Sequence, residues 1–197
     1  MRRTLPSSLR LLGCCVVLLS GCTALGARMF TVSVDAINDP DYSGGTTYIL
    51  LSPDPTIDAT SNLLFREYGI MVERVMETRG YTRTSSEQDA DLAVFLSYGI
   101  GDPELNIYTD TVFNSTNSYT TYSRNLQLDA QILHDSQQVW NVRVGSTGTS
   151  GNLRDVIPVM LAAAEPYIGD NTNGAVSMRL LENSQRVQSV KGTTGEE

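Results

Sequence analysis

Cysteine is scarce in this sequence, and its positions exclude one common source of stability. The 197 residues include three cysteines, Cys14, Cys15 and Cys22, and all of them fall within the first 22 positions. No disulfide bond can therefore join two points in the rest of the chain. A fold built from that remainder must depend on its apolar core alone, even in a compartment that permits disulfides.

Histidine is scarcer still, which removes most nucleophilic and zinc chemistry. The one histidine, His134, is expected in a tight turn beside Asp135 and Ser136. Neighbouring side chains in a turn point apart, and a hairpin tip rarely forms a pocket, so we do not expect a Ser-His-Asp arrangement there. One histidine without a free cysteine leaves only carboxylates as metal ligands. We therefore expect no catalytic residue of this kind, no metal and no cofactor.

Two loops look like ligand sites but lack a necessary residue. Segment 170–174 reads Asp-Asn-Thr-Asn-Gly, yet its glycine falls one position early, and Leu181 stands where a calcium loop needs a glutamate. The glycine-rich segment 145–151 could hold an anion, but no lysine follows it as in a phosphate-binding loop. We interpret the second segment as a connection that leads into a helix.

Basic residues are outnumbered by acidic ones. The chain has 14 Lys and Arg against 22 Asp and Glu, and three of the arginines lie within residues 1–21, which contain no acid. So acidic a protein lacks the electrostatic footprint of a nucleic-acid-binding protein, and anionic lipid repels it. We exclude nucleic acid as a partner. Attachment to a membrane would need a lipid anchor.

The N-terminal segment has the layout of a secretory signal and is too short to span a bilayer. Three arginines precede the uncharged apolar run 11–19, which is about half of the ~20 residues that a spanning helix needs. The next residues complete the sequence Leu19-Ser20-Gly21-Cys22, which resembles the lipobox of bacterial lipoproteins. The resemblance implies that Cys22 becomes the acylated N-terminus of the mature chain. The alternative is an ordinary signal peptide with a free thiol at Cys22.

These features divide the chain into four segments. We expect a lipoprotein signal peptide over 1–21, a short lipid tether over 22–28, a single α+β periplasmic domain over 29–183 and a disordered tail over 184–197. By resemblance to bacterial lipoproteins, Thr23 after the lipidated residue, in place of an aspartate, indicates the outer membrane. Fully extended, the six residues after Cys22 span roughly 20 Å, so the domain lies close to the bilayer.

Apolar periodicity predicts the elements of the domain. Alternating or continuous apolar runs predict strands, and apolar residues on one helical stripe predict two helices. The helices are expected to begin at Asp58 or Thr60 and at Asp155, which would place Pro158 in the first turn. The first two strands are expected to start the fold like a hairpin. The predicted strands are 29–37, 46–52, 81–85, 90–98, 124–133, 139–145 and 174–181, and the predicted helices are 58–79 and 153–167. This order indicates an α+β fold with a mostly antiparallel sheet and two helices packed on one face.

Segment 106–125 is the best candidate for specific recognition. It is rich in Thr, Ser and Asn, carries few charges, and is expected to form a hairpin with its tip near residues 114–117. Rigid aromatics among adaptable hydrogen-bonding side chains are typical of recognition surfaces, so the segment could bind a glycan or a protein edge. The alternative is that its aromatics pack back on the sheet. The candidate binding residues are Tyr108, Phe113, Tyr119 and Tyr122.

Three stretches together resemble bacterial envelope lipoproteins that carry a periplasmic domain of unknown function. They are Thr-Thr-Tyr-Ile-Leu-Leu at 46–51, the Gly-Tyr pair at 80–81 followed by Asp-Ala-Asp-Leu-Ala-Val at 89–94, and Leu-Gln-Leu-Asp-Ala at 126–130 leading to Val139-Trp140. The resemblance implies an α+β fold and an outer-membrane location, and it assigns no catalytic residue. The chain departs from that pattern over 102–125, so no function can be transferred to this segment.

The function expected from the sequence is that of a lipid-anchored binding or assembly module at the outer membrane. An envelope protein is the expected partner, and the sequence fixes no oligomeric state. The alternative is a hydrolase of envelope glycans that uses paired carboxylates. It would need a cleft that holds two carboxyl groups about 5–10 Å apart, one of them desolvated.

Overall fold

A computed structural model describes residues 26–193. The expected signal peptide, Cys22 and residues 22–25 of the tether lie outside the described residues, as do residues 194–197. Within the described part, no helix is both long enough and apolar enough to cross a membrane.

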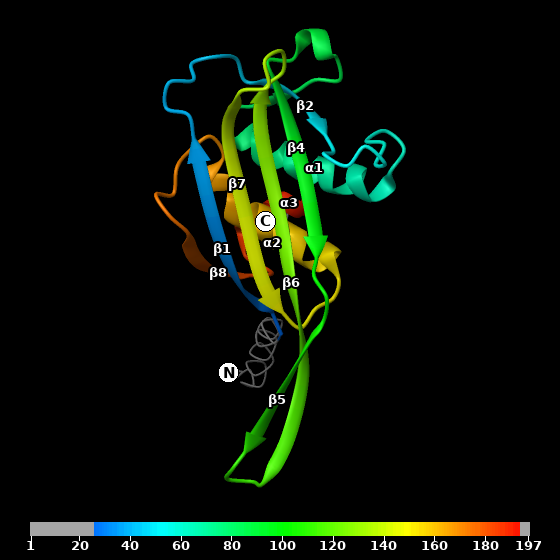
Figure 1. The fold of residues 1–197 in the computed structure, drawn as a ribbon, viewed down its shortest axis with the longest axis vertical. Coiled ribbons are helices and arrows are strands. Elements are labelled where there is room, and N and C mark those ends of the chain that lie inside the picture. The colour runs from blue at the N-terminus through cyan, green and yellow to red at the C-terminus, as the bar shows by residue number, and fades with distance from the viewer. Residues whose placement is uncertain (1–25, 194–197) are drawn as a thin grey trace, which may run out of the picture.

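The described chain forms an eight-stranded sheet and three α-helices, so the α+β class is confirmed (Figure 1). Two short 3-10 helices, η1 (Glu87–Asp89) and η2 (Glu165–Tyr167), complete it. In chain order the other elements are β1 (Met29–Asn38), β2 (Thr47–Leu51), α1 (Leu63–Thr78), β3 (Thr82–Arg83), β4 (Leu92–Ile100), β5 (Glu104–Asp110), β6 (Ser115–Ile132), β7 (Gln138–Gly148), α2 (Leu153–Ala164), β8 (Val176–Leu181) and α3 (Gln185–Lys191).

The sheet is mostly antiparallel, as predicted. The strands follow the order β3-β2-β4-β6-β7-β1-β8, and β5 pairs with β6 beyond this row. The β6–β7 pair, predicted as a hairpin, places Leu126 opposite Val144 and Leu128 opposite Val142, and all four side chains are buried. Every second residue of these strands therefore faces the core, as a half-buried antiparallel pair requires.

The expected hairpin between the first two strands is wrong. β1 pairs with β7 and β8 near one edge of the sheet, whereas β2 lies near the opposite edge and runs parallel to β3 and β4. The burial of Tyr48, Ile49 and Leu50 in succession explains this placement, because a strand buried on both faces fits inside a sheet. β1 instead alternates buried and exposed residues, as a strand with one open face does.

Three helices pack against the sheet, where two were expected. Figure 1 shows them behind the sheet, and each contacts the other two. α2 is apolar on all sides, with every residue from Val156 to Ala164 buried. The third helix, α3, lies in the segment 184–197 that was expected to be disordered, and it corrects that expectation for residues 185–191. Val187 and Val190, three positions apart, are both buried in the core. A short polar sequence can therefore fold when one turn spaces two apolar side chains for burial.

Both predicted helix starts need correction. α1 begins after Asn62, whose side chain accepts a hydrogen bond from the Phe65 amide, while Asp58 instead closes a turn with the Thr60 amide and hydroxyl. α2 begins after Asn152, ahead of the expected cap Asp155, so its proline lies inside the helix. In each helix an asparagine accepts the free amides of the first turn, which is the ordinary role of this residue.

Candidate functional site

The hairpin β5–β6 forms an arm that projects beyond the sheet (Figure 1). Seven residue pairs join its strands, from Glu104 opposite Thr121 to Asp110 opposite Ser115. At ~3.3 Å per residue the arm is about 23 Å long. β6 continues without interruption from the arm into the sheet, where it pairs with β7 from Tyr122 and with β4 from Arg124. The arm is thus an extension of the sheet's central strand.

The arm exposes apolar side chains that no other part of the described chain covers. Its tip, residues 111–114, contains the two most exposed large apolar side chains of the described chain, Val112 and Phe113, which are 83% and 79% exposed. Leu105 and Ile107 lie on one face of the arm, and Tyr108 and Tyr119 lie on the other. Continuous exposed apolar area of this kind marks an interaction site more often than an ordinary surface.

The predicted recognition residues are brought together only in part. Tyr108 and Tyr119 lie diagonally across the arm with their ring centroids 6.1 Å apart, and Phe113 stands at the tip. Tyr122 lies at the base, half-buried, with its ring so close to Gly151 that a Cβ there would be 3.2 Å away. The alternative that the aromatics pack back is therefore right for Tyr122 and wrong for the other three.

The turn at the tip is held by one carboxylate. The Asp110 Oδ1 atom accepts hydrogen bonds from the backbone amides of Val112 and Phe113, at 2.9 and 3.2 Å. Asn114 then takes a left-handed conformation with φ of +47°, which this residue tolerates better than most. The tip lies three residues earlier than predicted, and its geometry directs the two apolar side chains outward.

At the base of the arm, Arg124 is buried. It is 2% exposed, and its guanidinium donates to the backbone carbonyls of Ser146 (3.5 Å) and Ser150 (3.1 Å). Burial lowers the pKa of Arg124. Gly148 leaves room for the guanidinium, because a Cβ at this position would lie 2.6 Å from the Nη2 atom. The arginine thus ties the middle of β6, where the arm meets the sheet, to the loop that precedes α2.

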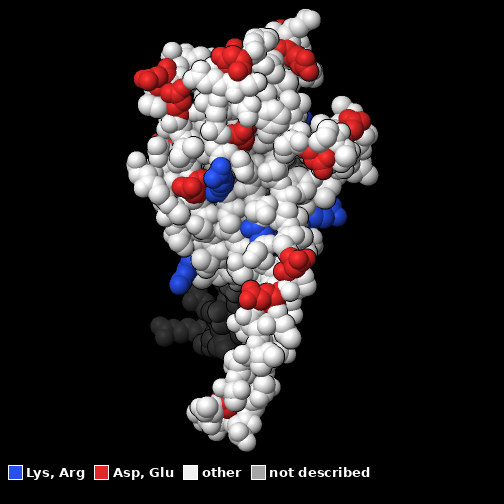
Figure 2. All heavy atoms as spheres, viewed as in Figure 1, with Lys and Arg blue, Asp and Glu red and all other residues white. Residues whose placement is uncertain are grey.

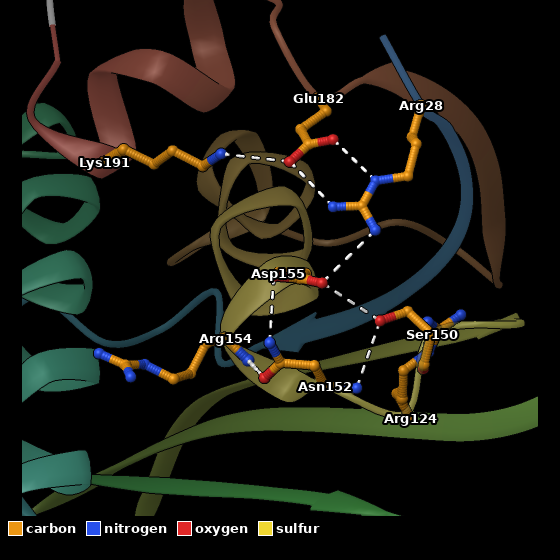
Figure 3. Close-up of polar contacts among 8 residues, drawn as sticks. All are labelled: Arg28, Arg124, Ser150, Asn152, Arg154, Asp155, Glu182 and Lys191. Carbon is orange, nitrogen blue, oxygen red and sulfur yellow. Dashed lines mark hydrogen bonds and ion pairs between the residues drawn. The ribbon is translucent and has the colours of Figure 1, made fainter. Parts of the chain in front are cut away.

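Polar contacts connect that loop to Arg28, the residue at which the tether enters β1 (Figure 3). The Ser150 hydroxyl donates to Asp155 at 3.3 Å, and the Asn152 side chain donates to the same carboxylate at 3.2 Å. Asp155 also accepts a hydrogen bond from Arg28 at 3.4 Å. A continuous series of polar contacts therefore runs from Arg124 to Arg28, which we call the basal network.

Arg28 is held most firmly by Glu182. Its Nε and Nη2 atoms donate to the two oxygens of Glu182 at 2.9 and 3.2 Å, and Lys191 approaches the same carboxylate at 3.6 Å. Hydrogen bonding from Arg28, followed by the charges of Arg28 and Lys191, lowers the pKa of Glu182 and outweighs its partial burial. The last residue before β1 is thus joined to the end of β8 and to α3.

Charge is distributed unevenly along the molecule. Strand register places loops 39–46, 86–91 and 133–137 at the end of the sheet opposite the arm. These loops contain no Lys or Arg and six acids: Asp39, Asp41, Glu87, Asp89, Asp91 and Asp135. Figure 2 shows acidic side chains gathered at that end, while the arm is almost free of charge. His134 lies exposed in the β6–β7 turn of this end, as predicted.

The helix-free face of the sheet contains a shallow cavity of about 400 Å³. Its one carboxylate is Asp129, which accepts hydrogen bonds from the side-chain amides of Gln131 at 2.8 Å, of Asn141 at 3.0 Å and of Gln138. The other lining residues are Pro53, Phe95, Ser97 and Gln127. Within the described chain, no three His, Cys, Asp or Glu side chains are grouped as metal ligands.

The basal network was not predicted from the sequence, although one signal for it exists. The even-numbered residues Leu126, Leu128 and Ala130 face the core, and Arg124 has the same parity. A charged residue in phase with core positions indicates a buried charge. Arg28 offers no such signal, because its partners Asp155 and Glu182 are more than a hundred positions away in the sequence.

Sequence comparison identifies no relative. No protein-family model matches the chain, and no curated protein shows significant similarity to it. Solved structures give a looser likeness. A PDZ domain protein from Parabacteroides distasonis has a TM-score of 0.48 and 12% identity, and the alignment covers 77% of this chain but 39% of that one.

Two other bacterial structures align over most of their own length. A PelC dodecamer from Paraburkholderia phytofirmans has a TM-score of 0.43 and 12% identity, over 72% of this chain and 99% of that chain. A DUF4136 family protein from Bacteroides thetaiotaomicron has a TM-score of 0.34 and 14% identity, over 81% of this chain and 92% of that chain. A family of unknown function is thus among the similar structures. With these TM-scores below 0.5, we derive no function from any of the three.

Proposed function

We propose that the protein is a lipid-anchored, non-catalytic binding or assembly module at the periplasmic face of the outer membrane. The observation that carries the proposal is the arm, a two-stranded projection with apolar side chains on both faces. An isolated two-stranded hairpin is marginally stable in water. Exposed apolar side chains on such an element are explained by a partner that covers them.

The arm offers two ways of holding an envelope protein. β5 pairs with β6 alone among the described strands, so its outer edge has free backbone donors and acceptors. Such an edge can take up an extended segment of a partner, while Leu105 and Ile107 give it an apolar face to cover. We therefore propose that the partner lies along the strands of the arm.

The alternative of a glycan hydrolase finds less support. A paired-carboxylate mechanism needs one acid whose pKa is raised. Four described carboxyl groups have a shifted pKa, those of Asp54, Asp58, Asp91 and Glu182, and each is lowered by hydrogen bonds. The cavity on the open face has a single carboxylate, and three amides already bind it.

Site-specific cross-linking in intact cells tests the proposed partner. A photoreactive residue replaces Ile107 on the arm or, as the matched control, Ile37 on β1, which is also an isoleucine and is 50% exposed against 66%. We expect a discrete protein adduct from position 107 and none from position 37. Equal adduct patterns at the two positions, or no adduct at 107, would contradict the arm as the binding element.

Metabolic labelling tests the anchor separately. With labelled palmitate, we expect the wild-type chain to take up label and to remain with membranes. The C22S variant should stay unlabelled and appear in the soluble periplasmic fraction. A wild-type chain that is unlabelled and released by osmotic shock would overturn the lipid anchor.

A further inference from the structure

We propose that the tip of the arm, Val112 and Phe113, contacts the lipid bilayer beside the acyl anchor and orients the domain with its acidic end away from the membrane. This inference rests on the proposed lipidation of Cys22. It assigns a bilayer surface to the tip, whereas the protein partner proposed above lies along the strands of the arm.

The arm and the tether leave the body at the same level. Val32 of β1 and Arg124 of β6 both pair with Ser146 of β7, so these two residues lie in one row across the sheet. β1 and β6 run in the same direction, since each is antiparallel to β7. Three residues earlier on each strand, Met29 is therefore level with Thr121, where the arm begins.

From this common level, the arm and the tether have the same reach. The arm extends for the seven pairs of β5 and β6 and then turns. The tether from Cys22 to the start of β1 is residues 22–28, and its fully extended length is about 23–25 Å, against about 23 Å for the arm. With the acylated residue at the bilayer surface, an extended tether brings the tip to that surface. A tether that is less than fully extended brings the tip closer still to the bilayer.

The basal network holds the last residue of the tether at a fixed position relative to the arm. Arg28, the last tether residue, is bound to Asp155 and Glu182, and the same Asp155 reaches the base of the arm through Ser150 and Arg124 (Figure 3). The point at which the tether leaves the domain is therefore fixed relative to the arm. Figure 1 shows this end of β1 beside the base of the arm.

The side chains at the end of the arm suit a membrane interface. Val112 and Phe113 are apolar and point outward, and Tyr108 and Tyr119 lie in the third and fifth residue pairs above them. Aromatic rings with a polar edge favour the boundary between lipid headgroups and acyl chains. The one charge near the tip, Asp110, already accepts two backbone hydrogen bonds.

The acidic loops favour the same orientation. The loops at the end opposite the arm contain six acids and no Lys or Arg. Anionic headgroups repel this end, while the nearly uncharged arm can approach them. Attraction of the apolar tip to the bilayer and repulsion of the acidic loops from it thus favour the same orientation of the domain.

Quenching of tryptophan fluorescence by brominated lipid tests the inference. The full lipidated protein is reconstituted in phosphatidylethanolamine–phosphatidylglycerol vesicles with or without bromine on the acyl chains. The F113W variant places a tryptophan at the tip, and I37W places one on the open face of the sheet as the matched control. Wild-type protein, whose single tryptophan is the buried Trp140, gives the background.

We expect brominated lipid to remove at least about twice as much of the added emission in F113W as in I37W. Equal quenching in the two variants would overturn the tip contact, as would an F113W emission that is shielded from water but insensitive to bromine, which indicates a protein or a second copy at the tip. Flotation of the same samples separates the two proposals. Protein that does not float with the vesicles refutes the anchor, and the tip contact with it.

Discussion

At the scale of single residues, Arg124 decides how the arm is attached. A buried guanidinium is costly unless its donors are satisfied, and here two backbone carbonyls accept from it. Ser146 belongs to β7 and Ser150 to the loop before α2, so one side chain joins three parts of the chain. The residue therefore fixes the direction in which β6 leaves the sheet.

The space for this arginine depends on one glycine. In G148A the new methyl group would lie 2.6 Å from Arg124 Nη2, so the guanidinium must shift from the position in which it donates to the carbonyls of Ser146 and Ser150. We expect a loss of about 1–3 kcal/mol in the free energy of unfolding. The control is G145A on the same strand, where no atom lies within 4 Å of the added carbon. Urea unfolding measures both, and equal stabilities would refute the steric argument.

Glu182 makes the basal network sensitive to pH. Because the folded protein lowers its pKa, Glu182 contributes stability above the ordinary glutamate value of 4.5 and loses it as the pH falls through the lower folded value. Near neutral pH, we expect wild type to exceed E182Q by up to about 1 kcal/mol. The difference should vanish in strong acid. Urea unfolding of both variants across this range is the measurement, and a pH-independent difference would contradict it.

At the scale of elements, the sequence predicts most strands and misplaces the ones whose neighbours are distant. Alternation identifies β1, β6 and β7, because a strand with one open face shows the pattern directly. The position of β2 beside β4 is not encoded in its own residues, since a doubly buried run fits any interior place in a sheet. The composition of the sequence predicts the aromatic arm, but it does not predict the buried Arg124 at the base of the arm.

The third helix shows why composition misled at residues 184–191. The segment is polar on average, yet two valines are buried in the core, while the other side chains are exposed or half-buried. We expect V187A to cost about 2 kcal/mol in the free energy of unfolding, because a buried methyl pair is lost. Q185A, at an exposed position of the same helix, should cost less than about 0.5 kcal/mol. Thermal unfolding compares the two, and similar values would mean that α3 does not pack as described.

The arm should be separable from the body. Replacing residues 105–120 by an Asn-Gly turn rejoins Glu104 to its partner Thr121 through the favoured two-residue connection. Since β5 pairs with β6 alone among the described strands, we expect the stability of the body to change by less than about 1 kcal/mol. A body that no longer unfolds cooperatively would show that the arm supports the fold.

At the scale of the whole molecule, the equal lengths of arm and tether matter more than either alone. A Gly-Ser insertion after Leu25 that doubles the tether leaves the anchor and the fold unchanged but lets the domain move away from the bilayer. We expect the quenching of F113W by brominated lipid to fall toward that of I37W. Flotation with vesicles should be unaffected. Unchanged quenching would mean that the tip holds the membrane without help from the tether.

The continuity of β6 has a mechanical consequence. Its 18 residues contain neither glycine nor proline, and they run from the tip of the arm to the acidic end through the middle of the sheet. Such a strand has no natural hinge. The arm and the body should then tilt as one rigid lever, so that a partner pulling on the arm would swing the distant acidic loops through a wide arc.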